Sequence, residues 1–136
     1  MIVIIIDSHP VFLNGLTQFL YQLHPGAKVL RYPTISAFTA ASEQVLPDII
    51  ILGVNRLWKP GEVKLFEAAS RPLSMKGIIL FYDEVHMVVP FLKTGASGFI
   101  GKKGEPQELA DCLESILKGK RYLSNELLEW MIRPTK

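Results

Sequence analysis

The chain has little that would support a disulfide framework, a membrane span or a secretory leader. Its 136 residues include a single cysteine, Cys112, so an internal disulfide and a cysteine-based metal site are excluded. The apolar start, residues 1–6, is followed by Asp7 and carries no basic segment. It is too short to cross a bilayer and does not have the pattern of a signal peptide. We therefore expect a cytoplasmic protein that makes no membrane contact.

An excess of charge of one sign is also missing. The chain has 15 Lys and Arg against 13 Asp and Glu, a formal net charge of +2, which neither favours nor excludes nucleic acid as a partner. Hydrophobic residues make up 49% of the chain, which is enough for a packed core and too many for a disordered segment. The length suits one compact domain.

Short apolar runs alternate with segments of helical periodicity, which predicts a parallel α/β sheet with helices on both faces. The run that ends at Gly53 is typical of a strand buried on both faces. Strands are expected at 2–7, 28–32, 47–53, 77–81 and 98–100, and helices at 10–23, 34–45, 62–70, 84–94 and 106–118.

Five such βα units in this length fit a flavodoxin-like, doubly wound (βα)5 sheet with strand order 2-1-3-4-5. Beyond Gly119, Ser124 is a candidate N-cap for a short C-terminal helix that contains Leu127, Leu128 and Met131. We therefore expect one domain at residues 1–120, followed by a C-terminal helix or linker at 121–136.

Three segments together resemble the receiver domain of two-component response regulators, and in particular its NarL/FixJ subfamily. They are Asp7-Ser8-His9-Pro10, the strand that ends at Gly53, and Gly-Ala-Ser-Gly-Phe-Ile-Gly-Lys, which ends at Lys102. The resemblance covers residues 2 to about 124. Members of this subfamily usually carry a LuxR-type helix-turn-helix domain behind the receiver. The resemblance thus implies transcription regulation, with DNA bound only through a C-terminal domain that these residues do not include.

The resemblance also places a degenerate phosphorylation site at the ends of the strands. In the family, two acids after the first strand and an aspartate after the third bind Mg²⁺, and that aspartate accepts the phosphoryl group. Asp7 matches the first acid, Ser8 stands at the second, and Gly53 stands at the phosphoacceptor. Asn55 falls where a backbone carbonyl ligates the metal, and Lys102 matches the lysine that contacts the phosphoryl oxygens.

The family's switch hydroxyl, a serine or threonine at the end of the fourth strand, has no match. An ungapped count lands on Leu80, and a shorter loop would move the match to Phe81 or to Tyr82, which at least has a phenol. The resemblance leaves this position open between them.

Two of the three expected carboxylates are missing, so we expect no phosphorylation at Gly53 and lost or weak Mg²⁺ binding, and hence no cofactor. Asp7 and Lys102, left without other partners, are expected to form an ion pair across the crevice. We expect no catalytic residue. An unrelated flavodoxin-like enzyme is disfavoured, because no glycine-rich phosphate loop follows the first strand and no nucleophile–base pair is evident.

Two features suggest an altered surface. Trp58, in the predicted loop 54–61, is a candidate to cap the degenerate site, although a half-exposed loop tryptophan is an equal alternative.

Pro90 lies inside the predicted helix 84–94, where a proline costs ~3 kcal/mol or more, so this helix should be short, kinked or started late. The helix has too many apolar residues for one buried stripe, which suggests a partner interface or a deeper packing. The candidates for the interface are Val85, Val88, Val89, Phe91 and Leu92.

Two functions remain open. The first is a pseudo-receiver, a phosphorylation-independent regulatory and dimerisation module of a LuxR-type transcription regulator that acts as a homodimer or through a partner protein. The alternative is a stand-alone adaptor of receiver fold that binds a signalling protein through its fourth and fifth helices.

Overall fold

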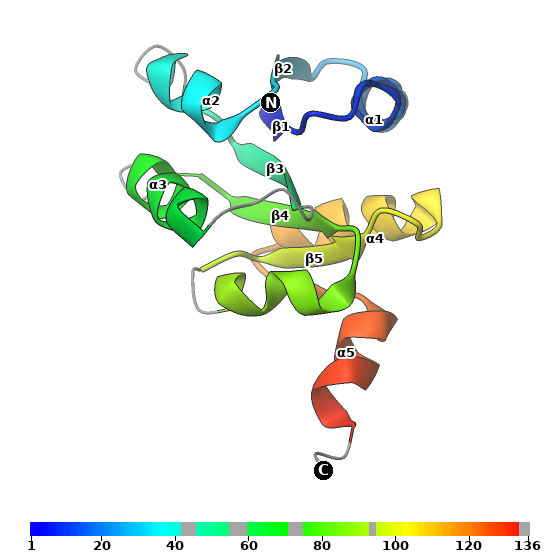
Figure 1. Ribbon diagram of the computed structural model, residues 1–136. Helices are drawn as coiled ribbons and strands as arrows, with labels where there is room; N and C mark the ends of the chain where they lie inside the picture. Colours follow the sequence, from blue (N-terminus) through cyan, green and yellow to red (C-terminus); the bar gives the residue numbers. More distant parts are fainter. Residues whose placement is uncertain (42–45, 55–59, 71–74, 93–94, 134–136) are drawn as a thin grey trace.

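Parallel strands form a single sheet in the computed structural model, which describes residues 1–41, 46–54, 60–70, 75–92 and 95–133 (Figure 1). Within these residues the strand order is β2-β1-β3-β4-β5-β6. The strands are β1 (Ile2–Ile6), β2 (Lys28–Tyr32), β3 (Ile49–Val54), β4 (Gly77–Tyr82), β5 (Gly98–Gly101) and β6 (Tyr122–Leu123). All six residues of β3 are buried, as expected for a central strand covered on both faces.

Helices cover both faces of the sheet, and a separate hydrophobic core lies on each face. One core holds buried side chains from α1 and α4, and the other holds side chains from α2, α3, the 3₁₀ helix η2 and α5. These elements are α1 (Pro10–Leu23), α2 (Ile35–Ala41), α3 (Pro60–Ser70), η2 (Val85–Phe91), α4 (Pro106–Leu117) and α5 (Asn125–Ile132). The flavodoxin-like α/β class predicted from the sequence is confirmed.

The C-terminal segment differs from the expectation in one respect. Tyr122–Leu123 forms the strand β6, which pairs in parallel with β5 through Gly98↔Tyr122 and Phe99↔Leu123. A two-residue strand is too short to leave a period-two pattern in the sequence, so only the helix after it was predicted. The order 2-1-3-4-5 is therefore correct for the first five strands and incomplete at the edge.

The predicted helix 84–94 is shortened to η2, a seven-residue 3₁₀ helix that contains Pro90. Proline lacks the N–H that a continuing α-helix needs, which accounts for the short, tight form. Val88 and Phe91 are 0% and 1% exposed in the core, so placing them in a partner interface was wrong. Val85 and Leu92 pack in part against the same core, and Val89 is 44% exposed.

Candidate functional site

The sequence-predicted site residues meet at the C-terminal edge of the sheet. Asp7 directly follows β1, Gly53 lies near the end of β3, Tyr82 ends β4 and Lys102 directly follows β5. In open parallel sheets this edge, next to the point where the strand order reverses, is where ligands bind. Here the reversal lies between β1 and β3, the strands that carry Asp7 and Gly53.

The carboxylate of Asp7 occupies the space that a side chain at position 53 would need. A Cβ atom built on Gly53 would overlap Asp7 Oδ2 and lie 2.6 Å from Asp7 Cγ. Asp7 is buried, with 3% of its surface exposed. The missing side chain of Gly53 thus makes room for the neighbouring acid.

A compact charged cluster surrounds this carboxylate. Asp7 Oδ2 lies 2.7 Å from Lys102 Nζ, so the ion pair predicted from the sequence is present. Asp7 Oδ1 accepts a hydrogen bond of 2.7 Å from the backbone N–H of His9. Lys102 Nζ also lies 3.1 Å from His9 Nδ1, 3.8 Å from Asp83 Oδ1 and 4.7 Å above the ring centre of Phe12. The ammonium is thus held from several sides by this chain's own groups.

Two members of this cluster, His9 and Asp83, were not among the site residues expected from the sequence. Asp83 directly follows β4, and its backbone N–H donates to Val54 O at 3.3 Å. Its position one residue after a strand was the available signal, because the ends of parallel strands meet at this edge.

Among the described residues, the donor set of the crevice does not match what Mg²⁺ requires. Ser8 is exposed and offers a hydroxyl, Gly53 offers no side chain, and the carboxylate of Asp7 is engaged by Lys102. Mg²⁺ is held in proteins by one or two carboxylates together with phosphate oxygens. No group of three or more His, Cys, Asp or Glu side chains in the described part of the chain is placed to hold a metal ion. Asn55 and the proposed capping residue Trp58 lie outside the described residues.

No small hydroxyl of β4 faces the crevice in the described structure. Leu80 is fully buried in the core on the α2 and α3 side, and Phe81 pairs in register with Gly53. The ring of Phe81 packs edge-on against Phe12, with centroids 5.2 Å apart. Tyr82 is 1% exposed, and its phenol forms a hydrogen bond of 2.6 Å with Ser124 Oγ, away from the Asp7–Lys102 pair. Burial raises the pKa of the Tyr82 phenol above its ordinary value, so the group stays neutral.

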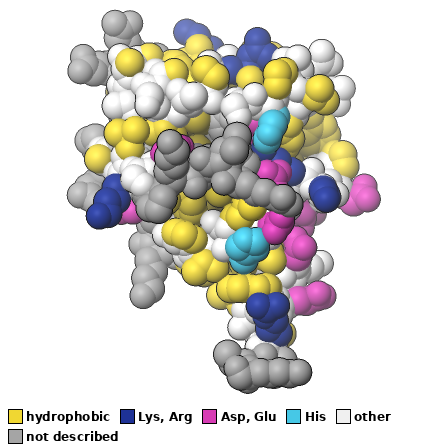
Figure 2. All heavy atoms as spheres, viewed as in Figure 1, with side chains coloured by type: hydrophobic (Ala, Val, Ile, Leu, Met, Phe, Trp, Pro, Cys, Tyr) yellow, Lys and Arg dark blue, Asp and Glu magenta, His cyan; other side chains and the backbone are white. Residues whose placement is uncertain are grey.

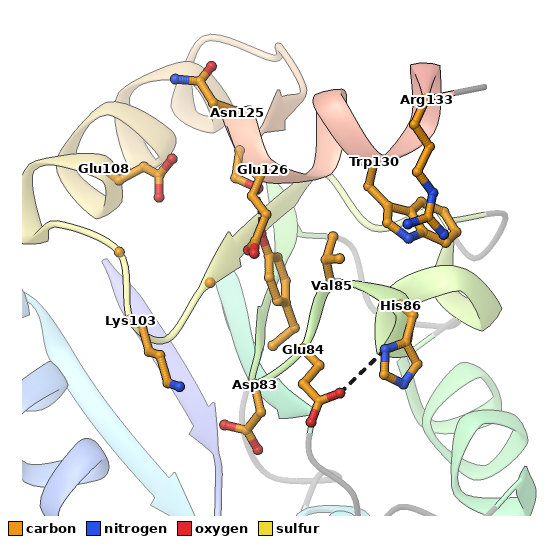
Figure 3. A pocket seen from close by; sticks show the side chains of 14 residues that line it. Asp83, Glu84, Val85, His86, Lys103, Glu108, Asn125, Glu126, Trp130 and Arg133 are labelled. Carbon is orange, nitrogen blue, oxygen red and sulfur yellow. Dashed lines mark hydrogen bonds and ion pairs between the residues drawn. The ribbon is translucent and has the colours of Figure 1, made fainter.

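Among the hollows that flank the cluster, two adjoin its acidic residues, Asp7 and Asp83. One, of about 530 Å³, lies over the crevice between the ends of β1 and β3 and the helices α2 and α3, and includes Asp7, Gly53 and Glu62 in its lining. The other, of about 780 Å³, lies between the end of β4, η2 and α5 (Figure 3). In Figure 2 hydrophobic side chains are scattered over the visible face among charges of both signs. Among the described residues drawn on this face, no broad basic patch is visible that would indicate a nucleic-acid surface.

Curated relatives match the chain along nearly its whole length. It is 28% identical over 127 residues to the nitrate/nitrite response regulator NarL of Escherichia coli, a match that covers 92% of this chain and 58% of NarL. It is 25% identical over 128 residues to the glycerol metabolism activator of Pseudomonas putida, which covers 93% and 58%. The chain therefore spans somewhat more than half the length of these relatives. No protein-family model matches it.

Solved structures also superpose on the chain over most of its length. A LuxR family DNA-binding response regulator from Silicibacter pomeroyi superposes with a TM-score of 0.76 at 26% identity, over 93% of this chain and 98% of that one. The isolated receiver domain of RcsB from Salmonella enterica, solved with the phosphomimetic BeF3⁻, has a TM-score of 0.80 at 21% identity, over 95% and 96%. No helix among the described residues is long and apolar enough to cross a membrane.

Proposed function

We propose that this chain is a receiver domain of the LuxR/NarL type, that it is the regulatory module of a LuxR-type transcription regulator, and that it works without phosphorylation. The observation that carries the proposal is the position of Asp7. Its carboxylate fills the space of the residue-53 side chain and pairs with Lys102 at 2.7 Å. The two charged groups left from the expected phosphorylation site thus neutralise each other.

The chemistry supports this proposal. Phosphoryl transfer to a receiver needs a carboxylate nucleophile and cations that neutralise the charge on the phosphoryl oxygens. Gly53 supplies no nucleophile, and Lys102 already has the Asp7 carboxylate as its partner. An incoming phosphoryl group would have to compete with the Asp7 carboxylate for the Lys102 ammonium in a buried ion pair. Mg²⁺ would have to compete with the same ammonium for the Asp7 carboxylate.

We further propose that the output of this domain is association with a second copy of the chain or with a partner protein. RcsB, whose receiver has the same fold, forms dimers on DNA in a solved structure. Of the interface candidates named from the sequence, Val89 presents an exposed apolar side chain on η2. DNA binding is assigned to a helix-turn-helix domain of the full regulator and not to this domain.

An NMR titration tests whether the crevice takes up a phosphoryl group. Backbone amide spectra of the chain would be recorded with Mg²⁺, first alone and then with beryllofluoride, which mimics a phosphorylated aspartate. The proposal expects no saturable shifts at Asp7, Gly53 and Lys102. The isolated RcsB receiver, which was solved with this phosphomimetic, serves as the positive control for the reagents. Saturable shifts at those residues that spread to η2 would contradict the proposal.

A variant with both carboxylates restored tests whether their absence explains why the crevice takes up no Mg²⁺ or beryllofluoride. Ser8→Asp together with Gly53→Asp returns the two missing carboxylates to the positions that the family resemblance assigns. If this variant gains Mg²⁺-dependent shifts, the missing carboxylates explain the inactivity of the site. If it stays silent while still folded, the two missing carboxylates do not explain the inactivity of the site.

A further inference from the structure

A buried hydrogen bond joins the crevice edge of the sheet to the C-terminal helix. Tyr82 is the last residue of β4, and Ser124 is the residue from which α5 begins. Their hydroxyl oxygens are 2.6 Å apart, and the two residues are 1% and 2% exposed. They are 42 positions apart in the sequence, so this contact is made by the fold and not by local geometry.

Ser124 is the anchor of α5. Its Oγ accepts a hydrogen bond of 3.2 Å from the backbone N–H of Leu127, the bond of an N-cap, and its carbonyl accepts 3.0 Å from Leu128 N–H. Its own backbone N–H donates to Phe99 O at 3.0 Å. A serine hydroxyl has one donor and two acceptor sites, so Ser124 can cap the helix and bond to Tyr82 at once.

Tyr82 is held next to the charged cluster. Its carbonyl accepts a hydrogen bond of 2.9 Å from the backbone N–H of Lys102, and its partner in register is Gly101. The ring lies close over that glycine, because a Cβ atom on Gly101 would be only 3.2 Å from Tyr82 Cε1. The next residue, Asp83, reaches to 3.8 Å from Lys102 Nζ. One residue thus touches both the crevice and α5.

We propose that the Tyr82–Ser124 hydrogen bond is a fixed coupling that holds α5 in one position on the sheet. This coupling rests on the proposed function, because only a receiver that takes up no phosphoryl group can do without a mobile hydroxyl at the end of β4. The phenol of Tyr82, at the end of β4, is directed toward α5 and bonds to the serine that caps this helix. The helix is then positioned by the fold itself.

The sparse packing of α5 gives this bond weight. Of the helix residues only Leu127 is fully buried, and Trp130 packs in part against the core. The remaining large apolar side chains of α5 are exposed; they are Leu128 (42%), Met131 (49%) and Ile132 (80%). Figure 1 shows α5 extending from the edge of the sheet, and Figure 3 shows Glu126 and Trp130 on the side of α5 that faces the groove. Among the described residues, the start of this helix is therefore held by the burial of Leu127, the backbone bond from Ser124 to Phe99 and the Tyr82 bond.

Amide hydrogen exchange on the Tyr82→Phe variant tests the coupling, because this change removes the hydroxyl and keeps the ring. A buried hydrogen bond contributes about 0.5–1.5 kcal/mol, so the amides of α5 should exchange about two- to tenfold faster. Amides of the central strand β3 should change much less. Tyr122→Phe is the matched control. Tyr122 lies on the strand β6, and this change removes a hydroxyl that donates to Glu108 Oε2 at 3.2 Å. It should leave the exchange of α5 unchanged.

Three results would overturn the coupling. The first is unchanged α5 exchange in Tyr82→Phe, and the second is an equal acceleration in α5 and β3, which would mean a general loss of stability. Ser124→Ala removes the bond from its other end, so adding Tyr82→Phe to it should accelerate α5 little further. The third result is full additivity of these two changes. The result is separable from the phosphomimetic titration, because a crevice that binds beryllofluoride would refute the proposed function without altering these exchange rates.

Discussion

The carboxylate of Asp7 lies where the side chain of residue 53 would be, and Gly53 is the residue that leaves it room. An aspartate placed at position 53 would meet the Asp7 carboxylate. The crevice is therefore built around an internal ion pair between Asp7 and Lys102, and the glycine on the neighbouring strand makes that arrangement possible.

Gly53→Ala should destabilise the fold by about 1–3 kcal/mol, because its Cβ overlaps Asp7 Oδ2 and either the strand or the ion pair must shift. Urea unfolding followed by circular dichroism measures this. Gly15→Ala is the control, since Gly15 lies inside α1 with open space around it and should gain up to about 1 kcal/mol of helix propensity. Equal effects at the two glycines would contradict the overlap.

Asp7→Asn and Lys102→Met should each be costly, about 3–5 kcal/mol, since each leaves a buried charge without its partner. The double variant should cost clearly less than the sum of the two. A double-mutant cycle from urea unfolding gives this coupling energy. The exposed pair Glu114–Lys118, 2.9 Å apart on the surface of α4, should be close to additive in the same experiment. Strict additivity of Asp7 and Lys102 would show that their contact contributes no stability.

The part of the site that follows from strand ends could be predicted from the sequence. Asp7, Gly53 and Lys102 each sit at the end of an apolar run, and parallel strands bring such ends together. The ion pair followed because these two opposite charges had no other expected partner. The direction of the Asp7 side chain could not be predicted, because it depends on the space left by a glycine on a neighbouring strand.

Elsewhere the sequence pattern was ambiguous. The apolar residues of η2 have no clear period, so Val88 and Phe91 could not be separated from Val89 as core residues. The short strand β6 gave no alternation at all. The hydrogen bond between Tyr82 and Ser124 could not be predicted either. The two residues are 42 positions apart in the sequence, and the role of Ser124 as a helix cap required no second contact.

Stability should fall at alkaline pH. Burial raises the pKa of the Cys112 thiol from 9.0 to about 12, and it also raises the pKa of the Tyr122 phenol from 10.0 to about 12. Above pH 9 the unfolded chain loses these protons while the folded chain keeps them, so the folded state binds more protons and its stability declines as pH rises. Urea unfolding between pH 8 and pH 11 should show the decline, beginning near pH 9. A flat profile would contradict the raised values.

The two neighbouring valines of η2 provide a sharp test of how this helix packs. Val88 is 0% exposed and Val89 is 44% exposed. Val88→Ala should cost about 2 kcal/mol because it leaves a cavity in the core, whereas Val89→Ala should change stability by less than about 0.5 kcal/mol.

The exposed valine of η2, Val89, also tests whether this helix contacts a partner. Val89→Lys keeps the fold, and it should weaken self-association in sedimentation experiments if η2 forms part of a dimer contact. A dimer of unchanged affinity in Val89→Lys would place the contact on another face of the domain. A large stability loss in Val89→Ala would mean that η2 packs in the opposite sense, with Val89 in the core.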